Sequence, residues 1–309
     1  MTVSMEEVVQ HLSNTDKPVQ LVKHIDEVPG SKLKWPAIAE VKEDGVYCLL
    51  VVADGKRKLF TRTGKPMYYE EMDDTLNVLC TRQGYAYITE LVNYYMSLET
   101  LSGLVNPNRV NPWSDDEFNL MMRGAKLVYH DVISVPDLIK GKSNVPFVDR
   151  RNVLYDHIQP NQLVRSTPVS SMLEFDAFVA GCIAANGEGA VLKQLDTPWV
   201  AGHKGFHVTK RVRGIHVDLR CTGVKYGKPG KHQHWIAALE FEYKGKKFWA
   251  DLGKGWDNDK RDYLTKGYEK NRYNVIGQVF HVKALQESSK GVLRLPKVAE
   301  YRIDKEEQD

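Results

Sequence analysis

The residues with the clearest potential for chemistry lie in the segment Glu40-Val41-Lys42-Glu43-Asp44-Gly45, between two apolar runs. Lys42 is flanked by carboxylates and stands next to a glycine turn. A lysine amine acts as a nucleophile in covalent catalysis when burial or neighbouring cations favour its neutral form. The alternative is an ordinary surface lysine, because most lysines are solvated. The rest of the chain must decide between these two interpretations.

Three carboxylates interrupt apolar runs that are typical of strands. They are Glu90 in 88–92, Asp131 in 128–132, and Glu188 just before 190–193. Burying a carboxylate is costly unless it is paired or bound to a cation. These positions therefore predict either a metal or ligand site or a set of ion pairs with Lys and Arg. Lys193 and Lys210 are cations that could hold a phosphate.

Hydrophobic periodicity and turn signals indicate the elements that position these residues. The predicted strands of the first two thirds are 37–62, read as a hairpin with its turn at Asp54-Gly55, then 85–91, 126–134 and 190–193. The predicted helices are 3–12, 72–81, 148–158 and 171–185. After residue 213, short apolar segments alternate with glycine- and lysine-rich turns at 217–224, 235–243, 247–251 and 275–284. This pattern predicts a small all-β unit of about five strands and a boundary near Arg213–Gly214.

Composition excludes several classes of protein. The chain has 309 residues, of which 42% are hydrophobic and 27% charged, as in ordinary soluble proteins. It has no apolar run long enough to span a membrane and no signal-peptide pattern at the N-terminus. Four scattered cysteines argue against a zinc site or a disulfide framework and suit a reducing compartment. Residues 214–309 hold 19 Lys and Arg against 14 Asp and Glu, so a polyanion is one possible partner of this part.

Taken in order, the motifs resemble those of the covalent nucleotidyltransferases. The matching segments are Lys42-Glu43-Asp44-Gly45, Thr61-Arg62-Thr63-Gly64, Glu90, Tyr129-His130-Asp131, Glu188 to Lys193, Val208-Thr209-Lys210, and Arg302-Ile303-Asp304-Lys305. They cover residues 40–305 and resemble a compact, phage-type ATP-dependent DNA ligase. This resemblance implies an α+β fold with a nucleotidyltransferase (ATP-grasp-like) domain of antiparallel sheets and helices over 1–213. A small all-β OB-fold domain over 214–309 is expected to follow it.

The resemblance also implies a three-step reaction. Lys42 attacks the α-phosphate of ATP and forms lysyl-AMP, AMP passes to the 5′-phosphate of a nick, and the 3′-hydroxyl then displaces AMP. The expected partners are ATP and nicked duplex DNA, with Mg²⁺ as the metal and Mn²⁺ as a substitute. A monomeric protein of the cytoplasm, or of the host cytoplasm if phage-encoded, is expected, acting in DNA repair, replication or recombination.

Roles follow from the same resemblance, residue by residue. Glu40 shares a strand face with Lys42 and is expected to accept a hydrogen bond from the adenine amino group. Guanine has the carbonyl oxygen O6 at that place and cannot donate, so ATP is expected to be preferred over GTP. Arg62 is expected to contact ribose or the nick phosphate, and Glu90 and Glu188 ribose or the metal. Tyr129 or His130 is expected to stack on adenine, and Lys193 and Lys210 to hold phosphate. Arg302 and Lys305 are expected to contact the pyrophosphate, and the two domains must close for them to reach it.

Three positions depart from the family pattern, one of them the stacking position if His130 fills it. The first motif normally ends in arginine where Tyr47 stands, and the fifth normally begins with lysine where Val208 stands. A phenol does not replace a bidentate guanidinium. Four other classes of protein share part of this pattern. An RNA ligase and a capping guanylyltransferase generally lack the motif around Arg302, an NAD-dependent ligase has a cysteine-rich zinc module, and a non-catalytic OB-fold nucleic-acid-binding protein needs no Lys42.

Overall fold

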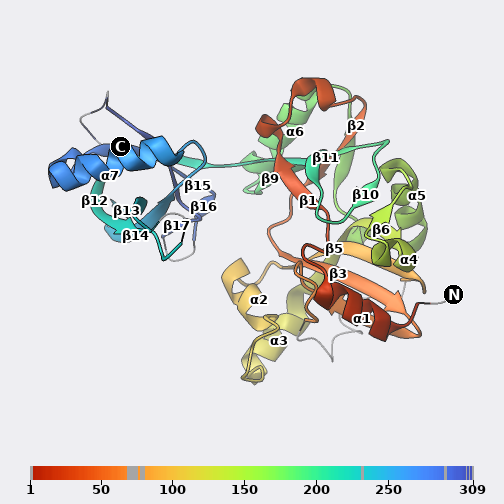
Figure 1. The fold of residues 1–309 in the computed structure, drawn as a ribbon. Helices are drawn as coiled ribbons and strands as arrows, with labels where there is room; N and C mark the ends of the chain where they lie inside the picture. Colours follow the sequence, from red (N-terminus) through yellow and green to blue (C-terminus); the bar gives the residue numbers. More distant parts are fainter. Residues whose placement is uncertain are drawn as a thin grey trace. The chain divides into compact units, whose positions relative to one another are not determined.

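The computed structural model describes residues 3–67, 76, 81–230, 233–288, 291–303, 305 and 307. The chain divides into two compact units, Met1–Val212 and Arg213–Asp309. This division falls one residue before the boundary expected from the sequence. Each unit has its own hydrophobic core, and the connection from β11 to β12 joins them (Figure 1).

The first unit contains a five-stranded sheet with strand order β1-β11-β9-β2-β8. Its strands are β1 (Leu21–His24), β11 (Lys204–Val212), β9 (Gly189–Gln194), β2 (Ala37–Val41) and β8 (Ser166–Val169). β1 runs parallel to β11, and the other neighbours are antiparallel. The resemblance implied antiparallel sheets, but this sheet is mixed, because β1 pairs parallel with β11 at its edge.

One face of this sheet is covered by helix α6 (Met172–Ala184), which forms a core with Ala39 and Leu192. Side chains alternate between the two faces of a strand. The intervening residues, among them Glu40 and Lys193, therefore point to the face that α6 leaves uncovered. The alternation thus gives the sheet one apolar face, which packs against α6, and one face that carries polar and charged side chains.

The second sheet of this unit has strand order β4-β3-β5-β6. Its strands are β4 (Lys56–Phe60), β3 (Val46–Ala53), β5 (Tyr85–Asn93) and β6 (Ala125–Ser134), and a small pair joins β7 (Lys142–Ser143) to β10 (Trp199–Val200). Helices α1 and α4 contribute to the core on one face, and α2, α3 and α5 to the core on the other (Figure 1). These helices are α1 (Met5–Asn14), α2 (Leu98–Leu104), α3 (Asp115–Gly124), α4 (Val135–Ile139) and α5 (Phe147–His157).

The predicted turn at Asp54-Gly55 is confirmed, since it joins β3 to the antiparallel β4. The interpretation of 37–62 as one hairpin was wrong for its first strand, because β2 pairs with β8 and β9 in the other sheet. The expected helix 72–81 lies almost wholly outside the described residues. Cys48, Cys182 and Cys221 are free thiols.

The second unit is built on a closed barrel with strand order β12-β13-β14-β18-β15. Its strands are β12 (Ile215–Tyr226), β13 (Ile236–Tyr243), β14 (Lys246–Leu252), β15 (Val279–Ala284) and β18 (Lys297–Tyr301), with β16 (Gln286–Glu287) and β17 (Leu293–Arg294) as a separate pair. Numbered within the unit, the order is 1-2-3-5-4 and closes on strand 1. A five-stranded barrel of this kind is the OB-fold.

Helix α7 (Asn258–Lys270) stands between β14 and β15 and packs on the barrel through Leu264 (Figure 1). The prediction of an all-β unit missed it. The segment is dominated by charged residues and buries just Leu264 and Thr265, so its apolar periodicity is weak. Asp257 caps its first turn by accepting from the Lys260 amide.

Candidate active site

A cavity of about 270 Å³ lies between the two sheets of the first unit. The five-stranded sheet contributes alternate residues of three strands, namely Glu40 and Lys42, Val191 and Lys193, and Val208 and Lys210. The four-stranded sheet contributes Tyr47, Ile88, Thr89, Glu90, His130 and Asp131. Gln20, Val22, Glu43, Arg62 and Trp199 complete the lining. Most of the residues predicted from the sequence therefore meet in one place.

Lys42 directly follows β2, and its amide donates to the carbonyl of Gly189 at 3.0 Å. Its Nζ lies 2.5 Å from Oε2 of Glu188, a side chain that is 5% exposed. Gly189 has φ +140°, and a Cβ there would lie 2.3 Å from the Arg211 carbonyl oxygen. Glycine is thus required at the position that brings Glu188 to Lys42.

Gly45 lets the segment after Lys42 cross closely over the second sheet. A Cβ at Gly45 would lie 2.4 Å from the Leu91 carbonyl oxygen and 2.7 Å from Cγ of Glu90. A side chain at this position would therefore force the segment away from Glu90. The glycine of the first motif has a packing reason that the sequence alone did not supply.

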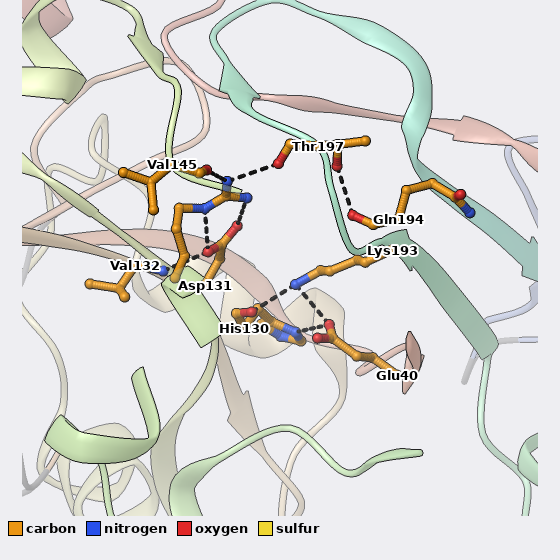
Figure 2. A network of polar contacts seen from close by, with 9 residues as sticks. Glu40, His130, Asp131, Val132, Val145, Lys193, Gln194 and Thr197 are labelled. Atoms are coloured by element: carbon orange, nitrogen blue, oxygen red, sulfur yellow. Dashed lines mark hydrogen bonds and ion pairs between the residues drawn. The ribbon is translucent and has the colours of Figure 1, made fainter. Parts of the chain in front are cut away.

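Glu40 is buried and forms the centre of a second polar group (Figure 2). Its Oε2 lies 2.9 Å from Nζ of Lys193 and 3.5 Å from Nδ1 of His130. Burial opposes ionisation of Glu40, but Lys193 and His130 outweigh it and hold the pKa of this carboxyl below its usual value. Lys193 and His130 therefore both contact the same carboxylate oxygen of Glu40.

Lys193, which was expected to hold a phosphate, lines the cavity and pairs there with Glu40. Its Nζ donates to the carbonyl of His130 at 2.7 Å as well as pairing with Glu40 (Figure 2). The ammonium thus binds β9 to β6 across the cavity and neutralises a buried carboxylate. This arrangement fits an anchor for Glu40 better than a phosphate contact.

His130 reaches the cavity through an irregularity in β6. Ile88 of β5 pairs with Asp131 and Thr89 pairs with Tyr129, so His130 is the extra residue of a bulge. Tyr129 was an alternative for stacking on adenine, but its side chain is fully buried and packs edge-on against Tyr87 at 5.7 Å. Tyr129 belongs to the core, and His130 is the aromatic ring of this pair that lines the cavity.

Asp131 is held in a buried ion pair with Arg150. The guanidinium donates to both carboxylate oxygens at 2.9 and 2.8 Å, and also to the carbonyls of Val145 and Thr197. Of the three carboxylates that interrupt apolar runs in the sequence, Asp131 is therefore the one explained by a buried ion pair with an arginine. It fixes β6 and α5 beside His130 (Figure 2).

Glu90 and Tyr47 face each other across β3 and β5. Burial raises the pKa of Glu90 to about 6, although His130 and Lys42 oppose the shift. Burial and then Glu90 raise the pKa of Tyr47, so the phenol stays neutral. Tyr47 cannot supply the charge of the arginine that the family usually has at this position.

Positive charge gathers at the Lys42 end of the cavity, where Arg62 and Lys210 also lie. Burial, followed by the charge of Lys42, lowers the pKa of Lys210. This end is therefore suited to an anion such as a phosphate. Arg302 and Lys305 belong to the second unit, where both pair with Asp218 at 2.9 Å.

Sequence reasoning missed Gln20, which lines the cavity just before β1. The buried Nε2 of Gln20 has no hydrogen-bond acceptor among the residues that the structure describes. No local motif marks it. The parallel pairing of β1 with β11 brings it to the site, and Val22 two residues later shares its face.

The family model of the ATP-dependent DNA ligase domain matches residues 19–211. The chain belongs to the ATP-dependent DNA ligase family. The matched region contains the whole cavity and every residue predicted to bind nucleotide, apart from Arg302 and Lys305 in the second unit. The protein is thus a ligase enzyme that uses ATP.

Solved structures of ligases share the fold. The structure titled "Pmar-Lig_Pre." has a TM-score of 0.71 at 20% identity, over 92% of this chain and 67% of that one. A structure of a Lig E DNA ligase has a TM-score of 0.68 at 15% identity, over 92% of this chain and 98% of that one. No curated protein has a sequence that matches this ligase. None of the helices in the described ranges is long and apolar enough to cross a bilayer.

The resemblance to ligases predicts a divalent cation, and the acidic residues of the site can be tested against it. In the described part of the chain, no three or more His, Cys, Asp or Glu side chains are arranged so that they could hold a metal ion by themselves. Mg²⁺ does not need such a group, because it is commonly held by one or two carboxylates together with substrate phosphates and water. Glu90 and Glu188 are carboxylates that can serve in this way, next to the cationic end of the cavity.

Proposed function

We propose that this ligase seals nicks with a 5′-phosphate and a 3′-hydroxyl in duplex DNA, by way of lysyl-AMP on Lys42 and an adenylated DNA strand. The observation that carries the proposal is the position of Lys42. Its amine lies 2.5 Å from Glu188, at the cationic end of a cavity whose other polar group is a buried carboxylate, Glu40. A nucleophile, an anion site and a base-recognition group thus share one cavity.

In the first step the Lys42 amine attacks the α-phosphorus of ATP. A P–N bond forms, the bond between the α-phosphorus and its bridging oxygen breaks, and pyrophosphate leaves. Glu188 orients the amine by its ion pair and lies within reach of the proton that the amine must lose. Arg62 and Lys210 supply positive charge for the phosphates, where charge develops in the transition state.

Adenine is recognised at the other end of the cavity. The buried carboxylate of Glu40 suits the exocyclic amino group of adenine as a hydrogen-bond acceptor, whereas guanine offers a carbonyl oxygen there. Lys193 keeps Glu40 ionised, and the bulge at His130 presents an imidazole ring for stacking. Val191 and Val208 provide apolar surface for the base.

Mg²⁺ held by Glu90 and Glu188 would neutralise charge on the phosphates. Mn²⁺, also an oxygen-binding cation, is proposed as a substitute. Lysyl-AMP then passes its AMP to the 5′-phosphate of the nick, and the 3′-hydroxyl displaces AMP to form the phosphodiester. We further propose that the barrel contributes phosphate contacts to duplex DNA through its excess of Lys and Arg, and that Arg302 and Lys305 contact the pyrophosphate in the first step.

The test is sealing of a 5′-phosphorylated nick in duplex DNA with ATP and Mg²⁺, together with transfer of labelled AMP to the protein. The wild-type protein should do both. Lys42→Ala should do neither, while still binding nicked DNA. Lys140→Ala removes an exposed lysine outside the cavity and serves as the matched control. Labelling of Lys42→Ala would contradict the assignment of the nucleophile, and sealing of nicked RNA but not of nicked DNA would favour an RNA ligase.

A further inference from the structure

Asp218 is a buried carboxylate on the outer side of the barrel. It lies on β12 between Val217 and Leu219, both of which pack in the barrel core. Alternation along the strand therefore turns Asp218 outward. An outward carboxylate is normally solvated, yet Asp218 is 4% exposed.

The cover over Asp218 is provided by the C-terminal segment and by β15. Oδ2 accepts from Arg302 Nη1 and from Lys305 Nζ, each at 2.9 Å. Oδ1 lies 2.7 Å from Nδ1 of His281, the residue paired with Asp218 across β12 and β15. The Arg302 amide donates to the Val279 carbonyl, and the Lys305 amide to the Arg302 carbonyl, so the segment turns both cations toward one oxygen.

Charge explains why this arrangement needs Asp218. Two like charges brought to the same point repel each other, and a carboxylate between them removes the repulsion. Arg302 and Lys305 remain 28% and 32% exposed, so both cationic side chains are held by Asp218 and are still accessible to an anionic ligand.

We propose that Asp218 is a positioning residue for the first chemical step. It holds Arg302 and Lys305 in the geometry in which they contact the pyrophosphate portion of ATP. Asp218 itself touches neither nucleotide nor DNA, and no motif of the sequence marks it. The inference rests on the proposed function, which assigns Arg302 and Lys305 to that step.

The test compares two reactions of Asp218→Asn, a substitution that keeps the size of the side chain and removes its charge. Formation of lysyl-AMP should slow by about 10- to 100-fold, the scale expected when catalytic groups are misplaced by about 1 Å. Sealing of a nick that already carries 5′-adenylate should stay within about threefold of wild type, because pyrophosphate takes no part in that step. Asp251→Asn is the matched control, since it breaks an exposed ion pair with Lys297 on the same barrel.

Three outcomes would overturn the inference. Equal rates of lysyl-AMP formation in Asp218→Asn and wild type would show that the carboxylate does not position the cations. Equal loss of both reactions, with Asp218→Glu failing in the same way, would show that Asp218 serves the fold of the barrel. A rise in lysyl-AMP formation would show that Asp218 restrains the cations. Failure of the wild-type protein to form lysyl-AMP would instead contradict the proposed function itself.

Discussion

Lys42 Nζ and Glu188 Oε2 lie 2.5 Å apart, although 146 residues separate them in the chain. The contact joins the residue that follows β2 to the residue that precedes β9, and these two strands are neighbours in one sheet. The register of a β-ladder, rather than any nearness in sequence, therefore places the Glu188 carboxylate against the Lys42 amine.

Glu188→Gln should slow lysyl-AMP formation by about 100-fold, because a neutral amide orients the amine poorly and cannot take up its charge. The measurement is the rate of labelling with AMP from labelled ATP under single-turnover conditions. Glu99→Gln, at an exposed position of α2, should label at the wild-type rate. A wild-type rate in Glu188→Gln would remove Glu188 from the first step.

The half-buried carboxyl group of Glu90 should make stability fall as pH rises. Its pKa is about 6 in the folded protein against 4.5 as the ordinary value, so the folded state binds the proton more tightly than the unfolded state. The free energy of unfolding should therefore drop by about 2 kcal/mol from pH 4.5 to pH 7, in metal-free buffer. Urea unfolding measures this, and Glu90→Gln should lose that part of the slope. A stability profile that is the same in both proteins would contradict the assignment.

Arg150→Met should destabilise the protein by about 3 to 5 kcal/mol, because it leaves the Asp131 carboxylate buried without its partner. Removing both charges with Arg150→Met and Asp131→Asn together should recover part of this loss. Lys297→Met, which breaks an exposed ion pair, should cost less than about 1 kcal/mol. Urea unfolding is the measurement. A similar loss of unfolding free energy in Arg150→Met and Lys297→Met would show that the buried Asp131 pair matters no more for stability than the exposed pair.

Gln20→Leu should raise the KM for ATP about 3- to 10-fold, the value of one hydrogen bond, while kcat stays within about twofold. The physical reason is the buried Nε2, which lines the cavity without an acceptor among the described residues. Gln10→Leu, on the exposed side of α1, is the control. ATP analogues that lack one ring nitrogen extend the test. Loss of the nitrogen that Gln20 contacts should raise the KM of the wild-type protein for the analogue but should not change the KM of Gln20→Leu.

The sequence predicted the parts of the site that local patterns encode. Alternation places Glu40 and Lys42 on one face, and the glycine turn at Asp54-Gly55 predicts the β3–β4 hairpin. The order of the motifs predicted which distant carboxylates would meet. Glu90 and Glu188 both lie close to Lys42. Lys42 and Glu188 influence the pKa of Glu90, and Lys42 forms a short ion pair with Glu188.

Other parts of the site depend on contacts without a local signal. The sequence left Tyr129 and His130 open as the stacking ring, because strand alternation cannot foresee the bulge at His130. The charge of Lys193 is visible in the sequence, whereas its ion pair with the buried carboxylate of Glu40 is not. Gln20 depends on the pairing of β1 with β11. The helix α7 was missed because its residues are mostly charged.

The four residues 42–45 connect β2 to β3, and these strands belong to different sheets. Gly45 seats that connection against the backbone of β5. Lys42 donates its amide to Gly189 of the five-stranded sheet, whereas Gly45 packs against Leu91 of the four-stranded sheet. Lys42 therefore lies where the chain passes from one sheet to the other, so the spacing between the sheets and the position of the Lys42 amine are coupled.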